Sequence, residues 1–259
     1  MPKPPVLPRG GFIVRINGFD MYCEVEGEGP FLVFLPGAMV CVDVFRPLVE
    51  AFRKRFTVLT ADASGQGRSA LGAGPITYVS MADDLVRLFD HLGIAEADCF
   101  GIGDGGACGL QLLIDFSDRV RSASLSSTAF SHWCYTAFGK DFIRRMPELV
   151  KSPTGILKVF YDVYAQVSPA PERFMEMAGR VARTWASAPN FNKAMLATIE
   201  KPTLVISSDR DDFVTEAAFR RLAACIPGAR LAHFPGMAHV PGVFRDAVAG
   251  AVAMFVGAV

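Results

Sequence analysis

The sequence predicts an α/β protein whose mostly parallel sheet is covered by helices on both faces. Short apolar runs with strand character alternate with amphipathic helical segments along most of the 259 residues. A hairpin signal opens the chain, and one long helical segment interrupts the alternation before it resumes. Parallel strands need helical crossovers, so this alternation favours one sheet between two helical layers.

An antiparallel hairpin is expected near the N-terminus. Two β-rich runs, 11–16 and 20–25, flank Asn17 and Gly18. Both turn residues tolerate the positive φ angles of a tight primed turn, which makes this pair a strong hairpin signal. The next run, 31–35, is apolar throughout, as in a strand that is buried on both faces.

Strands and helices then alternate towards the C-terminus. In the segment 81–92, for example, Leu85, Leu88 and Leu92 share one face of a helix. The expected strands are 57–61, 98–101, 120–126, 203–206 and 230–234, and the expected helices are 44–56, 81–92, 104–116, 216–225 and 243–255.

The segment 128–199 breaks this rhythm and predicts a helical lid inserted into a core domain of residues 1–127 and 200–259. Its helices are expected at 140–150, 155–166 and 172–185. Most of its aromatic and methionine side chains are expected to pack these helices together. Some of them would line an apolar pocket beneath the lid. The candidates for substrate contact are Phe130, His132, Trp133 and Trp185, although for His132 packing within the lid is an equal alternative.

Composition excludes several functional classes. The chain has 26 basic and 26 acidic residues, so no basic field would attract nucleic acid or anionic lipid. Its six cysteines form neither a CxxC pair nor a Cys/His cluster, so we expect reduced thiols and no metal site. We find neither a leader sequence nor an apolar stretch of membrane-spanning length, and therefore expect a cytoplasmic protein. A monomer and a homodimer are both compatible with the sequence.

Two polar residues follow consecutive strands in the last third of the chain. Asp211 comes just after the expected strand 203–206, and His239 comes just after 230–234. Ligands of open parallel sheets bind at the carboxyl ends of the strands. A carboxylate that orients a histidine fixes its tautomer and stabilises the imidazolium. An isolated loop histidine is more often structural, but the paired loops favour a general base.

A glycine-rich turn joins the strand 98–101 to the helix 104–116. Gly101, Gly103 and Gly105 provide the small residues that a sharp strand–turn–helix elbow requires. The same turn also satisfies the G-x-G-x-x-G fingerprint of dinucleotide-binding proteins. The end of the next strand offers no acidic residue for a ribose, however, and the motif lies deep in the chain. We therefore expect no nicotinamide and no other cofactor.

Together these features resemble the α/β-hydrolase-fold superfamily from Gly11 to the C-terminus. Further matching pieces are the loop Phe34-Leu-Pro-Gly37 and the turn Asp62-Ala-Ser-Gly-Gln-Gly-Arg-Ser69. The resemblance implies that Asp211 is the acid and His239 the base of the active site. It also implies that the backbone N–H groups of Ala38 and Asp104 form an oxyanion hole. The nucleophile position of the family falls on Gly103, where a serine is usual.

Three hypotheses explain Gly103. In the first, glycine is native and His239 acts as general base on water or on a substrate proton. In the second, a serine hydrolase has been inactivated by replacing its serine with glycine. In the third, the chain binds a small molecule without turnover. A fourth, less favoured interpretation makes Asp104 the nucleophile, which would put the branched Ile102 where a small residue is needed.

The leading prediction is an enzyme that acts on a small, largely apolar ester, lactone or related carbonyl compound. A cofactor-free lyase, decarboxylase or cyclase would use the same base and oxyanion hole and stays open as an alternative.

Overall fold

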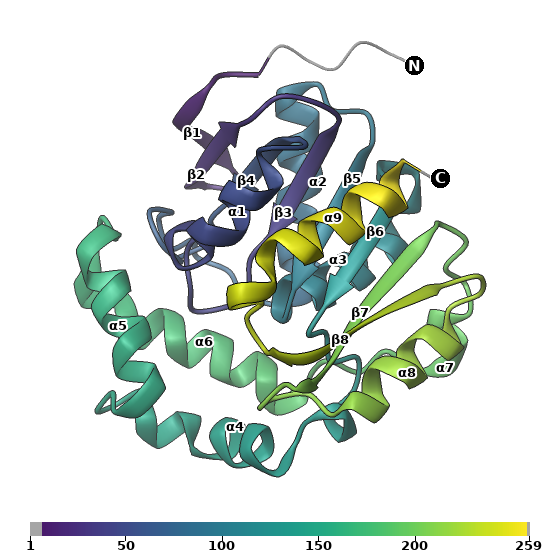
Figure 1. Cartoon of the computed structure of the whole chain (residues 1–259). Helices are drawn as coiled ribbons and strands as arrows, with labels where there is room; N and C mark the ends of the chain where they lie inside the picture. The colour runs from purple at the N-terminus through teal and green to yellow at the C-terminus, as the bar shows by residue number, and fades with distance from the viewer. Residues whose placement is uncertain (1–6, 258–259) are drawn as a thin grey trace.

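A computed structural model describes residues 7–257 and contains one eight-stranded sheet (Figure 1). The strands lie in the order β1-β2-β4-β3-β5-β6-β7-β8. Their bounds are β1 Gly10–Ile16, β2 Phe19–Glu26, β3 Phe31–Leu35, β4 Thr57–Ala61, β5 Ala97–Ile102, β6 Val120–Ser126, β7 Thr203–Arg210 and β8 Arg230–Ala238. All eight strands expected from the sequence are therefore present.

The sheet is antiparallel at one edge and parallel elsewhere. β1 pairs with β2, and β2 with β4, in antiparallel register. All pairs from β4 through β3, β5, β6 and β7 to β8 are parallel. Asn17 and Gly18 link β1 to β2 with φ angles of 45° and 85°, as the hairpin prediction required. The parallel strands thus end on one common edge of the sheet.

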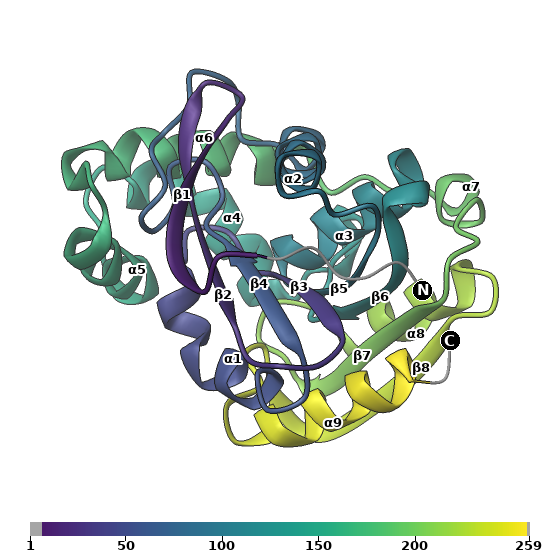
Figure 2. The same cartoon turned by 90° about the horizontal axis from the view of Figure 1, so that it is seen from above.

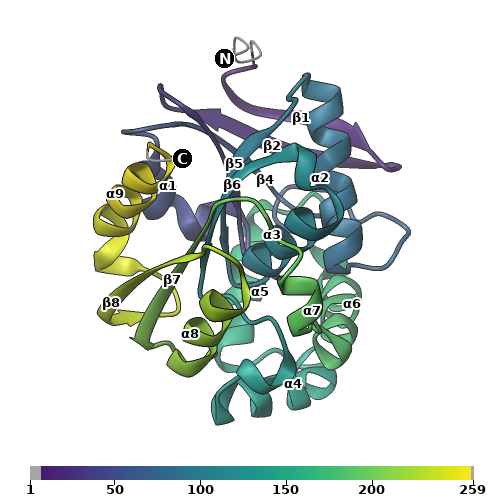
Figure 3. The same cartoon turned by 90° about the vertical axis from the view of Figure 1, so that its right-hand side faces the viewer.

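Helices cover both faces of the sheet (Figures 2 and 3). α1 and α9 pack together on one face, whereas α2, α3 and α8 lie on the other. The helices are α1 Arg46–Phe52, α2 Tyr78–Leu92, α3 Asp104–Asp115, α4 Ala137–Leu149, α5 Gly155–Val167, α6 Phe174–Ser187, α7 Lys193–Leu196, α8 Glu216–Cys225 and α9 Arg245–Val256.

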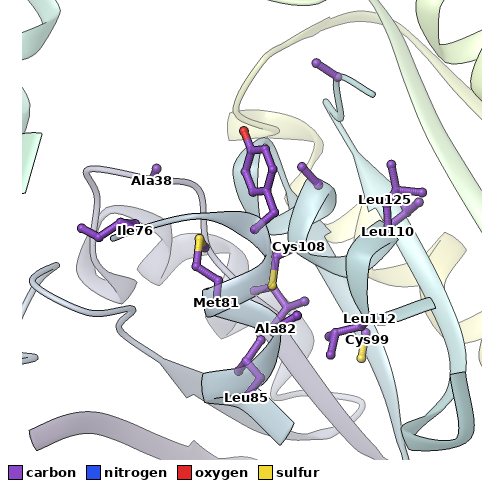
Figure 4. Packing of buried hydrophobic residues seen from close by; sticks show 14 of the residues in the cluster. Ala38, Ile76, Met81, Ala82, Leu85, Cys99, Cys108, Leu110, Leu112 and Leu125 are labelled. Atoms are coloured by element: carbon purple, nitrogen blue, oxygen red, sulfur yellow. The ribbon is translucent and has the colours of Figure 1, made fainter. Parts of the chain in front are cut away.

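Two apolar clusters fill the space between the sheet and its helical layers. The larger one packs α2 and α3 against the sheet and contains Leu85 of α2, Cys108 of α3 and Cys99 of β5 (Figure 4). It also includes residues of α8 and of the helices α4 to α6. The smaller one lies between the sheet and α1 and α9 and includes Phe34 and Phe52. Apolar burial on both faces explains why the central strands read as continuous hydrophobic runs.

Four helices, α4 to α7, follow β6 and precede β7 along the chain, and they correspond to the segment 128–199. In Figure 1, α4, α5 and α6 lie together beyond one end of the sheet. α4 contacts α6, and α6 contacts α5, so these three helices pack on one another. None of the helices within residues 7–257 combines the length and the apolar character that a membrane crossing requires.

Several element boundaries differ from the prediction. The helix expected at 44–56 is a 3-10 turn, Val42–Phe45, followed by the shorter helix α1. α2 begins at Tyr78 rather than at 81, because Thr77 and Ser80 form a capping box at its N-terminus. The short helix α7 was not predicted, since four residues carry too little periodicity to detect.

Candidate active site

The turn between β5 and α3 is a tight elbow with Gly103 at its tip. Gly103 has φ 58° and ψ −119°, a conformation that residues with a side chain rarely adopt. Its neighbour Gly105 lies against β3, so that a Cβ added there would come 1.9 Å from the carbonyl oxygen of Leu35. Gly103 therefore allows the backbone angles of the tip, and Gly105 allows α3 to pack closely against β3.

His239 and Asp211 are brought together at the ends of β8 and β7. The Nδ1 atom of His239 lies 2.9 Å and 3.0 Å from the two carboxylate oxygens of Asp211. Asp211 also accepts hydrogen bonds from the backbone N–H groups of Phe213 and Val214. Its carboxylate is thus fixed in place, and it holds the imidazole in one orientation.

The other ring nitrogen of His239 faces the elbow. A Cβ added to Gly103 would lie 3.4 Å from Nε2 of His239. The backbone of His239 is fixed as well, because the Ser127 hydroxyl donates a 2.7 Å hydrogen bond to its carbonyl oxygen. Ser127 has a positive φ of 52°, an uncommon conformation for a residue with a side chain. An imidazole oriented by a carboxylate therefore directs Nε2 at a tip without a side chain.

Burial and charge act in opposite directions on this pair. Burial opposes the charged form of His239, but the charge and hydrogen bond of Asp211 outweigh it, so the histidine pKa lies above its ordinary value. Burial would likewise raise the pKa of Asp211. The charge of His239 and the hydrogen bonds from His239, Val214 and Phe213 reverse this effect and lower it. The Asp211 carboxylate thus favours protonation of the imidazole.

Replacing Asp211 with asparagine should lower the pKa of His239, because the charge that stabilises the imidazolium is lost. We expect the imidazole to lose its proton at lower pH than in the wild type. NMR titration of the four histidine rings measures this shift, with His239→Gln assigning the signal. Glu216→Gln, which removes an exposed carboxylate on α8, is the matched control. A His239 pKa that is equal in wild type and Asp211→Asn would contradict the pairing.

The loop that carries Ala38 is fixed by the turn 62–69. The buried carboxylate of Asp62 accepts hydrogen bonds from the backbone N–H groups of Val42 and Arg68, both 3.0 Å long. Ser69 donates to the carbonyl oxygen of Asp62 over 2.6 Å. Burial raises the pKa of Asp62 to about 6, although the two backbone hydrogen bonds oppose this rise. The turn therefore supports the loop beside the elbow.

The Asp104 side chain is held by residues from two other helices. Its Oδ1 atom accepts hydrogen bonds from the Tyr78 hydroxyl, at 2.5 Å, and from the Trp185 indole, at 2.7 Å. Its Oδ2 atom lies 3.4 Å from the backbone nitrogen of Ala38. One of the two amides expected to form an oxyanion hole is thus in contact with a carboxylate, over a distance that is long for a hydrogen bond.

A cavity of about 340 Å³ opens beside the elbow. Gly103, Asp104 and His239 lie in its wall, together with Ala38. Apolar side chains dominate the rest of the wall, and several of them come from the inserted helices: Phe142 and Ile143 from α4, Ile156 and Phe160 from α5, and Trp185 from α6. The cavity therefore lies between the elbow and the inserted helices.

Of the four residues expected to contact substrate, Trp185 lines this cavity. Phe130, His132 and Trp133 are not among the lining residues that the structure describes. The Phe130 ring is buried in the larger apolar cluster and stacks edge-on against Trp133. Trp133 is 48% exposed, and His132 is exposed as well. All three residues lie in the stretch between β6 and α4.

Several polar or aromatic wall residues were not predicted as site residues, among them Tyr78, Tyr135 and Phe213. Tyr78 starts α2 and is buried, and burial, followed by the charge of Asp104, raises its pKa well above the ordinary value. Phe213 packs on the His239 ring, with their centres 5.0 Å apart. Its place two residues after Asp211 was the one available signal, because that loop has to lie beside His239.

Comparisons with known proteins agree with this architecture. The family model of the alpha/beta hydrolase fold matches residues 30–142. A protein assigned as carbamate hydrolase RutD of Azorhizobium caulinodans is 28% identical over 252 residues, which cover 89% of this chain and 94% of that protein.

Two solved structures cover 95% of the chain at 25% identity. One is a hydrolase from Pseudomonas aeruginosa PA01, with a TM-score of 0.76 and 98% of its own chain covered. The other is the enol-lactonase from Burkholderia xenovorans LB400, with a TM-score of 0.74 and 100% covered. The sheet order, the elbow and these likenesses lead to one conclusion: the chain has the α/β-hydrolase fold that the sequence predicts.

Proposed function

We propose that this protein is a hydrolase of small, largely apolar esters, lactones or related carbonyl compounds, with His239 as general base on water. The observation that carries the proposal is the position of His239 Nε2, which would lie 3.4 Å from a Cβ on Gly103. The names of similar proteins, a carbamate hydrolase and an enol-lactonase, support hydrolysis of an acyl bond. The inserted segment 128–199 would act as the lid that covers the substrate.

In this mechanism a water molecule takes the place of a nucleophilic side chain. His239 Nε2 accepts a proton from the water as its oxygen attacks the acyl carbon, and Asp211 stabilises the imidazolium that forms. The tetrahedral intermediate then collapses, the bond to the leaving oxygen breaks, and the imidazolium returns the proton to that oxygen. The products are a carboxylic acid and an alcohol.

The missing side chain at Gly103 gives the water its space. The cavity wall includes both Gly103 and the His239 ring, so a water between them would border the substrate space. The backbone N–H of Asp104 lies in the first turn of α3, where the helix dipole favours negative charge. With the N–H of Ala38, it would hold the carbonyl oxygen once the substrate displaces the long contact to Asp104 Oδ2.

Gly103→Ser tests whether the protein works without a covalent intermediate. We expect the serine variant to hydrolyse a panel of 4-nitrophenyl esters and lactones no faster than the wild type. The reason is that the new side chain would fill the water position and strain the tip backbone by about 1–3 kcal/mol. Rates of both proteins and labelling by a serine-directed fluorophosphonate are measured side by side. An inactive wild type beside a fast, labelled serine variant would overturn the proposal and identify a serine hydrolase that lacks its nucleophile.

A further inference from the structure

The cavity wall carries acidic side chains and few basic groups that would balance their negative charge. Asp104 and Asp212 both line it, and within residues 7–257 no lysine or arginine does. The imidazole of His239 is the one basic group of the described wall, and Asp211 already pairs with it over 2.9 Å. An anionic ligand would therefore meet repulsion here, and only the imidazole that Asp211 already pairs with could offset it.

Asp104 is held as a hydrogen-bond acceptor. The Trp185 indole can only donate, and it reaches Oδ1 over 2.7 Å. The Tyr78 hydroxyl donates to the same oxygen over 2.5 Å. Burial and the charge of Asp104 raise the pKa of Tyr78, so this hydroxyl keeps its proton at neutral pH. Both contacts orient the carboxylate towards the cavity from fixed positions on α2 and α6.

The second carboxylate oxygen of Asp104, Oδ2, accepts fewer and longer hydrogen bonds than Oδ1. A carboxylate oxygen can accept two hydrogen bonds. Among the described residues, the recorded donor to Oδ2 is the Ala38 backbone nitrogen, at the long distance of 3.4 Å. A carboxylate oxygen with spare capacity thus borders a cavity whose other walls are mainly apolar. Such an atom is costly to leave without a partner, so a ligand that supplies a donor gains affinity.

We propose that Asp104 is the polar anchor of the substrate site and selects small apolar molecules that carry an ammonium or hydroxyl donor, against carboxylate-bearing ones. The inference rests on the proposed function, because it names the substrate class of the same cavity. A donor bound to Oδ2 would also release the Ala38 amide, and an ammonium donor would offset the negative charge beside the elbow.

The test compares three ligands that share one skeleton: 3-phenylpropylamine, 3-phenylpropan-1-ol and 3-phenylpropanoate. Isothermal titration calorimetry at pH 7.5 gives their dissociation constants. We expect the amine to bind at least about tenfold more tightly than the carboxylate, with the alcohol between them. If the alcohol binds as tightly as the amine, the hydrogen bond selects the ligand. If the alcohol binds more weakly than the amine, the charge of the ammonium group contributes to the selection. A carboxylate that binds as tightly as the amine overturns the inference without any variant.

Asp104→Asn should reduce the preference for the amine over the carboxylate to less than about threefold. Asp115→Asn is the matched control, since it removes one charge from the exposed end of the same helix and should keep the preference. A preference that survives Asp104→Asn but disappears in Asp212→Asn would assign the anchor to the other carboxylate and overturn the inference.

The binding readout is independent of hydrolysis. His239→Ala should lose turnover but keep the preference for the amine, because it removes the one basic group of the described wall that could attract a carboxylate. If the wild type showed the preference but hydrolysed no ester, the proposed function would fail and the anchor would stand. If the wild type hydrolysed esters but bound the amine and the carboxylate equally tightly, the anchor would be refuted and the proposed function would stand.

Discussion

His239→Ala should lower kcat/KM for ester hydrolysis by roughly 10²- to 10⁴-fold, the range that a general base contributes. The imidazole is the group whose Nε2 faces the elbow, and Asp211 fixes its orientation through Nδ1. Without it, the attacking water would have to lose its proton to solvent. Initial rates with a panel of 4-nitrophenyl esters measure the effect.

The pH dependence should follow the same group. Because Asp211 raises the pKa of His239 above its ordinary value, the neutral base forms at higher pH than for a histidine without this partner. The wild-type rate should therefore rise with pH through an apparent pKa above about 6.5. His91→Ala, which changes an exposed histidine in the last turn of α2, is the matched control and should keep the wild-type rate. Equal losses in His91→Ala and His239→Ala would contradict a specific role for His239.

Gly105→Ala should have the largest effect on stability of any single methyl addition at the elbow. Its Cβ would come 1.9 Å from the carbonyl oxygen of Leu35 and 2.6 Å from that of Pro36. Both atoms belong to the backbone of β3 and the loop that follows it, so neither can move aside without disturbing the sheet. We expect a loss above about 3 kcal/mol in the free energy of unfolding, or failure to fold. Urea denaturation measures it.

Gly250→Ala is the control for this prediction. Gly250 lies within α9, and a Cβ added there would meet nothing within 4 Å. Alanine favours a helix by about 1 kcal/mol over glycine, so this variant should be slightly more stable than the wild type. A Gly105→Ala protein as stable as Gly250→Ala would show that α3 does not pack against β3 as described.

Most of the fold could be predicted because short strand-like runs alternate with amphipathic helical segments along the chain. Phe31–Leu35 was predicted to the residue because it is apolar throughout, and Thr57–Ala61 and Val120–Ser126 were predicted to the residue although polar side chains interrupt them. The extensions of β7 and β8 could not be predicted, since both strands end in exposed residues without alternation. The start of α2 was missed although Thr77 and Ser80 carry the signal, which periodicity alone does not use.

The candidate site was predictable only where topology alone brings residues together. Asp211 and His239 follow neighbouring parallel strands, so their approach could be expected from the order of elements. The contacts of Asp104 with Tyr78 and Trp185 join residues 26 and 81 positions apart, on helices whose packing no local pattern reveals. The same limit explains why Phe130 and Trp133 were expected at the cavity: aromatic composition does not show which way a side chain points.

The central claim is that water, activated by His239, attacks the substrate directly. Intact-protein mass spectrometry during turnover tests it, with the ester that the wild type cleaves fastest in the 4-nitrophenyl panel and acid quenching within the first turnovers. We predict that 4-nitrophenolate accumulates while the mass of the protein stays unchanged. An acyl adduct on the wild-type chain, formed and lost at the rate of turnover, would contradict this mechanism.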